Sequence, residues 1–145
     1  MKMKFTKIGK TVTALAIIGG IMMTTPKTEV EASSLEGRAA QTYTAYSLGP
    51  LGRNNYTNYH VKTTSDQYIL NRVTAIDNAS SAKFWAQTDS AKTISSTYTQ
   101  RVSTSNTQIN FTKSISKGDN VRLAMQNSNS LATYYGFVSG SVDFR

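Results

Sequence analysis

"KTISSTYTQRVSTSNTQINFTKSISKGDNVRLAMQN" runs from Lys92 to Asn127, and its apolar side chains fall on alternate positions within short runs. In the last run, Val121, Leu123 and Met125 occupy every second position. Alternation of this kind is typical of a strand with one buried and one exposed face. Because no segment after residue 42 repeats apolar residues at helical spacing over several turns, the sequence predicts an all-β chain.

The middle of this stretch predicts a β-hairpin. The apolar residues of its first run share one parity, and those of its second run share the other. These residues are Ile94, Tyr98 and Val102, followed by Ile109, Phe111 and Ile115. The polar turn "STSN" (103–106) separates the two runs. Two alternating runs joined by a polar turn indicate a hairpin.

The rest of the chain from Thr42 onward has the same character, with turn clusters about every 8–12 residues. Further strands are expected at 42–48, 57–63, 67–76, 83–87, 121–126 and 135–144. The run at 67–76 is nearly continuous in apolar and β-branched residues, so we expect it to be central and covered on both faces, or to bend between sheets. The fold class is therefore an all-β antiparallel sandwich or jelly roll of about seven or eight short strands. The chain has no cysteine, so no disulfide supports it.

Residues 1–32 have the features of a secretory signal peptide. Lysines at four of the first ten positions form a basic region, and an apolar stretch from Val12 to Met23 follows. Pro26 ends any helix, and Val30-Glu31-Ala32 fits the small-x-small cleavage rule, so we expect cleavage near Ala32. An uncleaved membrane anchor is the alternative interpretation, but the apolar stretch is short for a span.

The predicted export signal implies a secreted, extracellular protein. The long basic region and the "VEA" cleavage site resemble export signals of Gram-positive bacteria. Residues 33–41 are expected to form a flexible lead-in, and residues 42–145 a single β-sandwich domain. Removal of residues 1–32 leaves 113 residues with 11 basic and six acidic side chains, a net charge of +5.

The basic residues are dispersed along the chain, and no run of three occurs. A nucleic-acid partner would require clustered basic residues with aromatic residues between them, so we expect none. Dispersed positive charge outside a cell favours weak attraction to anionic surfaces such as teichoic acids or lipid head groups. The simpler interpretation is that this charge keeps the protein soluble.

The residues that usually carry catalysis are scarce. His60 is the only histidine, and it has no neighbour with the spacing of a metal site. No G-x-S-x-G elbow accompanies it. Most aspartates fall in turns, where Asp serves the backbone, and no D-x-D-x-D run suggests calcium. We therefore expect no enzyme activity, no catalytic residues, no metal and no cofactor.

Tyrosine is frequent: all eight tyrosines lie after residue 42. Aromatic rings that stack on sugars, with amides that bond hydroxyls, would form a glycan-binding face. Cross-strand pairing within a sheet is the alternative explanation for most of these rings. The residues expected to bind a ligand are Arg53, Tyr56, Tyr59, Trp85, Tyr134 and Tyr135. Tyr56 and Tyr59 lie near Arg53, and Tyr134 and Tyr135 follow the Asn-rich loop, which favours them as binding candidates because loops often carry binding residues.

The region from Gln87 to Gly118 suggests a second class of function. Fourteen of its 32 residues are Ser or Thr, arranged in two alternating runs. A membrane-inserting β-hairpin has a polar and an apolar face of this kind, although any half-exposed hairpin shows the same pattern. A membrane-active toxin or bacteriocin using this hairpin is thus the alternative to surface binding.

The closing segment "GFVSGSVDFR" (136–145) is expected to be the last strand. Val138, Val142 and Phe144 share one face with Gly140, so this glycine marks a bulge or a close approach of a neighbouring strand. Arg145 is expected to be a frayed, solvated end.

"DNVRLAMQN" (119–127) and "YYGFVSGSVDF" (134–144) resemble segments of a group of small secreted Gram-positive proteins of unknown function. Members of this group close on an Asn-rich loop and a V-S-G-x-x-D strand, matched here by Val138-Ser139-Gly140 and Asp143. The chain departs from them at Phe144-Arg145, where an aromatic and acidic tail is expected. The resemblance implies a small extracellular β domain and brings no catalytic residues.

These features predict a secreted, non-enzymatic bacterial protein. Its expected partner is a glycan or an anionic polymer of the cell envelope, such as a cell-wall polymer. Secretion, the charge of +5, the tyrosine-rich loops and the scarcity of catalytic groups together carry this expectation.

Overall fold

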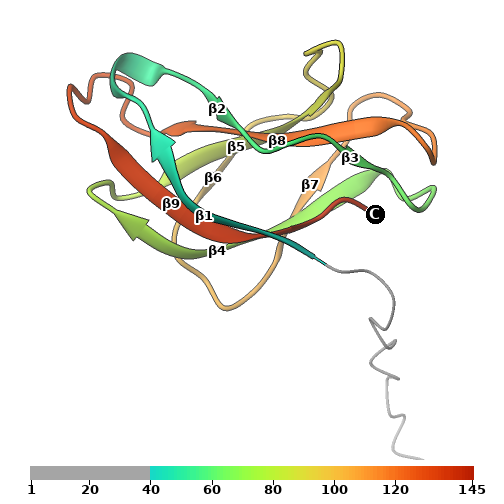
Figure 1. Cartoon of the computed structure of the whole chain (residues 1–145), viewed down its shortest axis with the longest axis horizontal. Helices are drawn as coiled ribbons and strands as arrows, with labels where there is room; N and C mark the ends of the chain where they lie inside the picture. Colours follow the sequence, from blue (N-terminus) through green and yellow to red (C-terminus); the bar gives the residue numbers. More distant parts are fainter. Residues whose placement is uncertain (1–39) are drawn as a thin grey trace, which may run out of the picture. The chain divides into compact units, whose positions relative to one another are not determined.

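A computed structural model describes residues 40–145 as nine strands and one short 3-10 helix (Figure 1). The predicted signal peptide, its cleavage site and nearly all of the predicted lead-in lie outside the described residues. The elements are β1 (Gln41–Leu48), η1 (Pro50–Gly52), β2 (Asn55–Tyr56), β3 (His60–Val61), β4 (Tyr68–Asp77), β5 (Ala82–Thr88), β6 (Tyr98–Gln100), β7 (Thr107–Asn110), β8 (Asn120–Asn127) and β9 (Gly136–Asp143).

Two antiparallel sheets make up the fold, which confirms the prediction of an all-β sandwich. The first has the strand order β1-β9-β4-β7, and the second has the order β2-β8-β5-β6, with β3 also paired to β8. The strand expected at 57–63 is only partly formed: β3 (His60–Val61) lies within it, and β2 (Asn55–Tyr56) is a separate short strand just before it, with both paired to β8. This difference raises the strand count above the seven or eight predicted.

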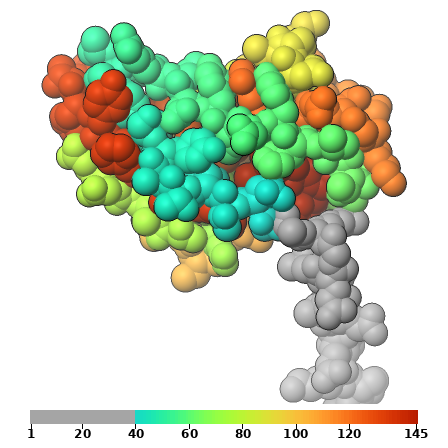
Figure 2. Space-filling model, in the orientation of Figure 1, coloured from blue at the N-terminus to red at the C-terminus, as the bar shows by residue number. Residues whose placement is uncertain are grey.

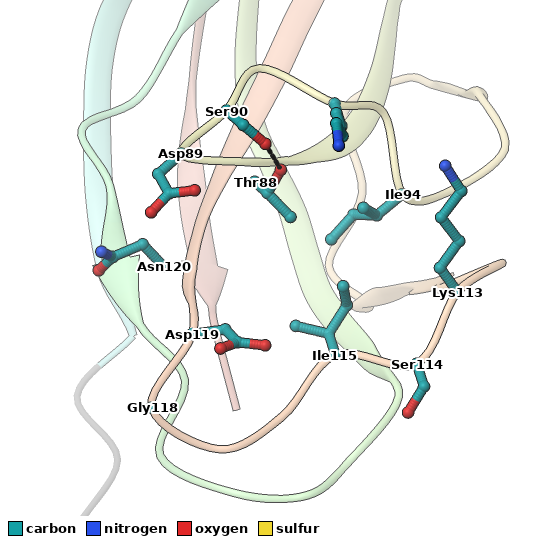
Figure 3. Close-up of a pocket in the computed structure, with 11 residues that line it drawn as sticks. Thr88, Asp89, Ser90, Ile94, Lys113, Ser114, Ile115, Gly118, Asp119 and Asn120 are labelled. Atoms are coloured by element: carbon teal, nitrogen blue, oxygen red, sulfur yellow. Dashed lines mark hydrogen bonds between the residues drawn. The ribbon is translucent and has the colours of Figure 1, made fainter.

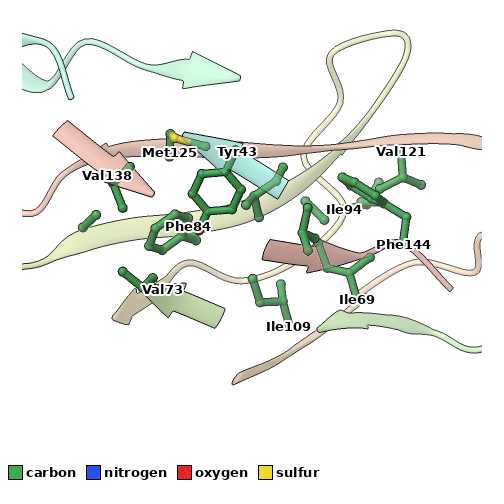
Figure 4. Close-up of a cluster of buried hydrophobic side chains, with 14 of the residues drawn as sticks. Tyr43, Ile69, Val73, Phe84, Ile94, Ile109, Val121, Met125, Val138 and Phe144 are labelled. Atoms are coloured by element: carbon green, nitrogen blue, oxygen red, sulfur yellow. The ribbon is translucent and has the colours of Figure 1, made fainter. Parts of the chain in front are cut away.

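The core lies between the two sheets. Figure 4 shows Tyr43 and Val138 of the first sheet close to Phe84 and Met125 of the second. Burial alternates along β9 as the sequence pattern predicts, with Val138, Gly140, Val142 and Phe144 buried on one side. On β8, Val121, Leu123 and Met125 are buried as predicted, but Ala124 between them is buried as well. The period-2 pattern therefore identified the core-facing residues of these strands correctly.

The predicted hairpin between 94 and 115 is wrong. β6 pairs with β5 in the second sheet, whereas β7 pairs with β4 in the first. The chain crosses from one sheet to the other between the two runs, which share one isolated bridge, Ser95 to Phe111. Period 2 tells which face of a strand is buried but not which strand lies beside it. A membrane-active role based on this hairpin therefore lacks its structural element.

β4 is an interior strand of its sheet, as expected, but the prediction that both its faces are covered is wrong. The alternative, a bend between sheets, is wrong too, because both its partners, β9 and β7, belong to the first sheet. Ile69, Asn71 and Val73 are buried, while Arg72 and Thr74 between and beyond them are exposed. The exposed side of the strand carries polar residues, so the near-continuous apolar run in the sequence overstated its burial.

Gly140 lies where β9 is most crowded, which confirms the predicted bulge and close approach. It pairs with Tyr43 of β1 and with Val73 of β4, and the register of each ladder shifts directly beyond these partners. Within the β1 irregularity, Ala45 has a φ of 51°, and its N–H donates to Ser139 Oγ at 2.9 Å. The Tyr43 ring then lies over the glycine, in space that a side chain at 140 would need.

Arg145 is anchored rather than frayed, so that prediction is wrong. Its Nε forms an ion pair with Asp143 Oδ2 at 2.9 Å, and its Nη1 donates to the Tyr68 hydroxyl at 3.1 Å. Its main-chain oxygen also accepts a hydrogen bond from Nζ of Lys62. Lys62 is 1% exposed, and its Nζ donates as well to the main-chain oxygen of Asp66. A buried lysine thus ties the end of the last strand to the β3–β4 loop.

The buried hydroxyl of Tyr43 should make the protein less stable at alkaline pH. It donates to Asn71 Oδ1 at 3.0 Å, and burial raises the pKa of Tyr43 well above its ordinary value of 10.0. The unfolded chain therefore loses this proton first as the pH rises above 10.0, so the contribution of the hydroxyl to stability falls there. We expect the stability advantage of wild type over Tyr43→Phe, measured by urea unfolding, to shrink above that pH and to stay constant below it.

Candidate functional site

The outer face of the second sheet carries a group of side chains, here called the Arg122 cluster, made of Tyr56, Tyr59, Gln87 and Arg122. Ladder register brings them together: Gln87 is the β5 partner of Arg122 on β8. On the other side of β8, Tyr56 ends β2 and Tyr59 immediately precedes β3. Residues of β8 alternate, so Val121 and Leu123 point to the core and Arg122 points outward.

The guanidinium of Arg122 is stacked on aromatic rings and fixed by an amide. Its Cζ lies 3.9 Å from the ring centroid of Tyr56 and 4.8 Å from that of Tyr59. Its Nε and Nη2 both donate to Gln87 Oε1, at 3.2 and 2.9 Å. Gln87 is itself nearly buried. These contacts hold a half-buried cation in one orientation, and stacking on tyrosine is favourable for arginine.

The hydrogen bonds to Gln87 use one edge of the guanidinium and leave the other edge open. Nε and Nη2 share the Gln87 oxygen, so the edge formed by Nη1 and the second proton of Nη2 keeps its donors. Within residues 40–145, no carboxylate lies within ion-pairing distance of Arg122. A fixed guanidinium edge without a carboxylate partner is suited to bidentate binding of a phosphate or carboxylate.

A hollow of about 410 Å³ adjoins this cluster (Figure 3). The two are joined by the Tyr59 hydroxyl, which donates to the main-chain oxygen of Asp89 at 3.1 Å, and Asp89 lies on the wall of the hollow. Figure 3 shows Asp89 and Asp119 on one side, facing Lys113 on the other. The hollow is large enough for a small polar unit, and its lining offers both charges and hydroxyl groups.

The structure brings only part of the predicted ligand-binding set together. Tyr56 and Tyr59 lie in the Arg122 cluster. Trp85 lies on the same sheet face, since it pairs with Ala124, but it is only 8% exposed and offers little surface. The remaining three predicted residues lie in the β1–β2 and β8–β9 loops and are not members of this cluster: Arg53, Tyr134 and Tyr135.

Sequence reasoning missed Arg122 and Gln87. Each is a polar residue at an alternating position of a predicted strand, which normally indicates a solvent-facing side chain. The sequence signal that could have found them is the pairing of an outward arginine with nearby tyrosines, but the strand register needed to pair them is not visible in one sequence.

His60 lies in a different environment from the Arg122 cluster. Its ring stacks on Phe144 with centroids 4.5 Å apart, and burial lowers the pKa of the imidazole. It borders a small hollow of about 110 Å³ beside Tyr43 and Tyr46. Within residues 40–145, no group of three His, Cys, Asp or Glu side chains could hold a metal ion. In the same residues, no helix is long and apolar enough to cross a membrane.

Comparison with known proteins finds no matching family model, no similar curated protein and no similar solved structure. The resemblance to small secreted Gram-positive proteins therefore stays a prediction from short motifs.

Proposed function

We propose that this protein binds an anionic glycopolymer of the bacterial cell envelope, a chain of sugar or polyol units linked by phosphodiesters. The observation that carries the proposal is the open guanidinium edge of Arg122, oriented by Gln87 and by the rings of Tyr56 and Tyr59. The role is one of binding, without a chemical step.

A phosphodiester is the anion that this geometry favours. Arginine presents a planar fork that matches two phosphate oxygens, and such charge-assisted pairs are stronger than neutral hydrogen bonds. Because the tyrosine rings and Gln87 already hold the side chain, binding costs little additional rotamer entropy. Because Arg122 is half-buried, dissolved salt screens its contact with a phosphate less than it would screen the contact of a fully exposed arginine.

The neighbouring hollow supports a polymer rather than a lone phosphate. It begins beside Tyr59, so one unit of a chain can occupy it while the adjoining phosphate lies on Arg122. Thr88, Ser90 and Asn120 line it with groups that bond hydroxyls. The predicted export signal would bring the protein to such polymers.

Binding to purified wall teichoic acid should depend on Arg122 beyond its charge. We expect Arg122→Gln to weaken binding by roughly 10- to 100-fold, the effect of losing one charge-assisted pair of hydrogen bonds. Arg122→Lys keeps the charge but loses the fork, and should also weaken binding severalfold. Biolayer interferometry across a salt series measures both effects.

Arg72→Gln is the matched control. Arg72 is an exposed arginine on β4, in the other sheet, and its replacement removes the same charge. It should change affinity by less than about threefold, because an exposed distant charge contributes only to general attraction. Equal losses for the two glutamine variants would show that the polymer senses net charge alone, and the proposal would fail.

A further inference from the structure

One end of the sandwich exposes an unusual number of large apolar side chains. Five of the eight exposed large hydrophobic residues between 40 and 145 lie in η1, the β8–β9 loop or the start of β9. They are Leu51, Leu131, Tyr134, Tyr135 and Phe137. Figures 1 and 2 show η1 and the β8–β9 loop side by side at the left end of the molecule, here called the apolar tip.

The two segments of the apolar tip are fastened to each other and to the sheets. The N–H of Leu51 donates to the main-chain oxygen of Ala132 at 2.8 Å. Gln126 donates its side-chain amide to the main-chain oxygen of Gly52, and Asn78 does the same to Tyr135 at 2.7 Å. The apolar side chains are thus carried on braced loops, which present them in fixed positions.

Leu51 has a backbone conformation that leucine rarely adopts. Its φ is 53° and its side chain is 70% exposed. The left-handed region suits Gly or Asn and costs a leucine about 1 kcal/mol or more. No burial offsets this cost, because the side chain points into solvent. Leu131, on the partner segment, is 81% exposed. A strained residue that displays an apolar side chain suggests that the side chain serves a contact.

The charges around the apolar tip favour an anionic surface. The three loops at this end, 49–54, 78–81 and 128–135, contain one charged residue, Arg53. Asp77, the exposed last residue of β4, is a carboxylate at the base of the tip, where it pairs with Phe137 of β9. Loops at the opposite end carry Asp66, Asp89 and Asp119. The end that exposes leucines therefore has a cation and lacks acids within its loops.

We propose that the apolar tip binds the surface of an anionic lipid bilayer, with Leu51 and Leu131 inserted among the acyl chains. Tyrosines behind an apolar apex suit the interface between head groups and hydrocarbon, where tyrosine is enriched. Arg53 then lies at the level of the anionic head groups. The tip and the Arg122 cluster are separate surfaces, so this inference stands apart from the polymer-binding role.

Sedimentation of residues 33–145 with vesicles of phosphatidylglycerol and phosphatidylcholine tests the inference. This chain contains every strand of both described sheets. We expect Leu51→Asn and Leu131→Asn each to weaken vesicle binding by about tenfold, the effect of leaving one leucine out of an apolar environment. Asn tolerates a positive φ, so Leu51→Asn should keep or raise the unfolding midpoint. Val102→Asn is the control, because Val102 is 57% exposed and lies outside the tip.

A fluorescent reporter separates insertion from surface attraction. Leu131→Trp should shift the emission of the chain to shorter wavelength on these vesicles, whereas Val102→Trp should not. Arg122→Gln should bind vesicles as the wild-type chain does, because Arg122 lies outside the tip. The vesicle result therefore does not depend on whether the polymer-binding proposal is correct. The inference is overturned if the chain does not sediment with anionic vesicles, if Val102→Asn loses as much as the leucine variants, or if the emission of the Leu131→Trp variant stays unshifted.

Discussion

Gly140→Ala is expected to lower the free energy of unfolding by more than about 3 kcal/mol, and to leave the chain largely unfolded if its total stability is modest. A Cβ at this position would overlap the main-chain oxygen of Arg72 and would lie 2.6 Å from Cζ of Tyr43. The Arg72 oxygen belongs to the adjacent strand and cannot move aside without disturbing the β4–β9 ladder. Urea unfolding followed by circular dichroism measures the loss.

Ser141→Ala is the matched control for this prediction. Ser141 is the next residue of β9, and its side chain lies on the other, half-buried side of the strand. Its replacement should change stability by less than about 0.5 kcal/mol. A Gly140→Ala variant with near wild-type stability would show that β1 and β4 are not packed around β9 as described.

Lys62→Met is expected to cost about 3 kcal/mol of stability. The variant keeps most of the apolar volume but removes the ammonium that donates to the main-chain oxygens of Asp66 and Arg145. Loss of a hydrogen bond from a charged donor to a part-buried acceptor costs about 1–3 kcal/mol. Burial lowers the pKa of Lys62, while Asp66, Asp119 and Asp143 act in the opposite direction. Without the positive charge of Lys62, the electrostatic repulsion among these three carboxylates is no longer offset.

Lys117→Met provides the comparison, because Lys117 is an exposed lysine in the β7–β8 loop. Its effect on the urea midpoint should be within about 0.5 kcal/mol. Hydrogen exchange adds a local measurement: Lys62→Met should speed the exchange of the Arg145 amide, which donates to Asp143 Oδ1 at 3.0 Å. Equal stability of the two methionine variants would contradict the anchoring role of Lys62.

The fold class could be predicted from the sequence because burial follows the pleat. Alternation along 121–126 and 138–144 identified the core-facing residues, and Gly140 indicated a crowded position. Strand neighbours could not be predicted in the same way. The runs around Ile94 and Ile109 look like a hairpin, yet their strands pair in different sheets. Which sheet a strand joins depends on packing between distant segments, and a local pattern does not contain that information.

The candidate site was less accessible to sequence reasoning than the fold. Tyr56 and Tyr59 were identified as binding candidates, but Arg122 lies more than sixty positions further along the chain and reaches them only through the register of β8. For Lys62 and Trp85, burial could not be predicted from the residue type. A lysine, or a tryptophan on the outer face of a sheet, is usually predicted to be exposed, but here both side chains are nearly buried.

The two proposed surfaces lie on different parts of one domain. The Arg122 cluster lies on the outer face of the second sheet, and the apolar tip is formed by loops at one end. A protein that holds an envelope polymer on one surface and a bilayer on the other would act where the two meet. Each proposed surface is tested with its own variants, so one proposal can be disproved while the other stands.

In the proposed function, Arg122 receives the phosphate of an envelope polymer. The most direct measurement is an NMR titration of the ¹⁵N-labelled chain with a purified glycerol phosphate oligomer, following the side-chain Nε–Hε resonance of Arg122 and the amides of Gln87 to Asp89. We expect a saturable shift of these resonances in the wild-type chain. In Arg122→Lys, the shifts of the neighbouring amides should need a severalfold higher oligomer concentration to saturate. An Arg122 resonance that does not move, while those of exposed basic residues such as Arg72 shift together without saturating, would contradict the proposed function.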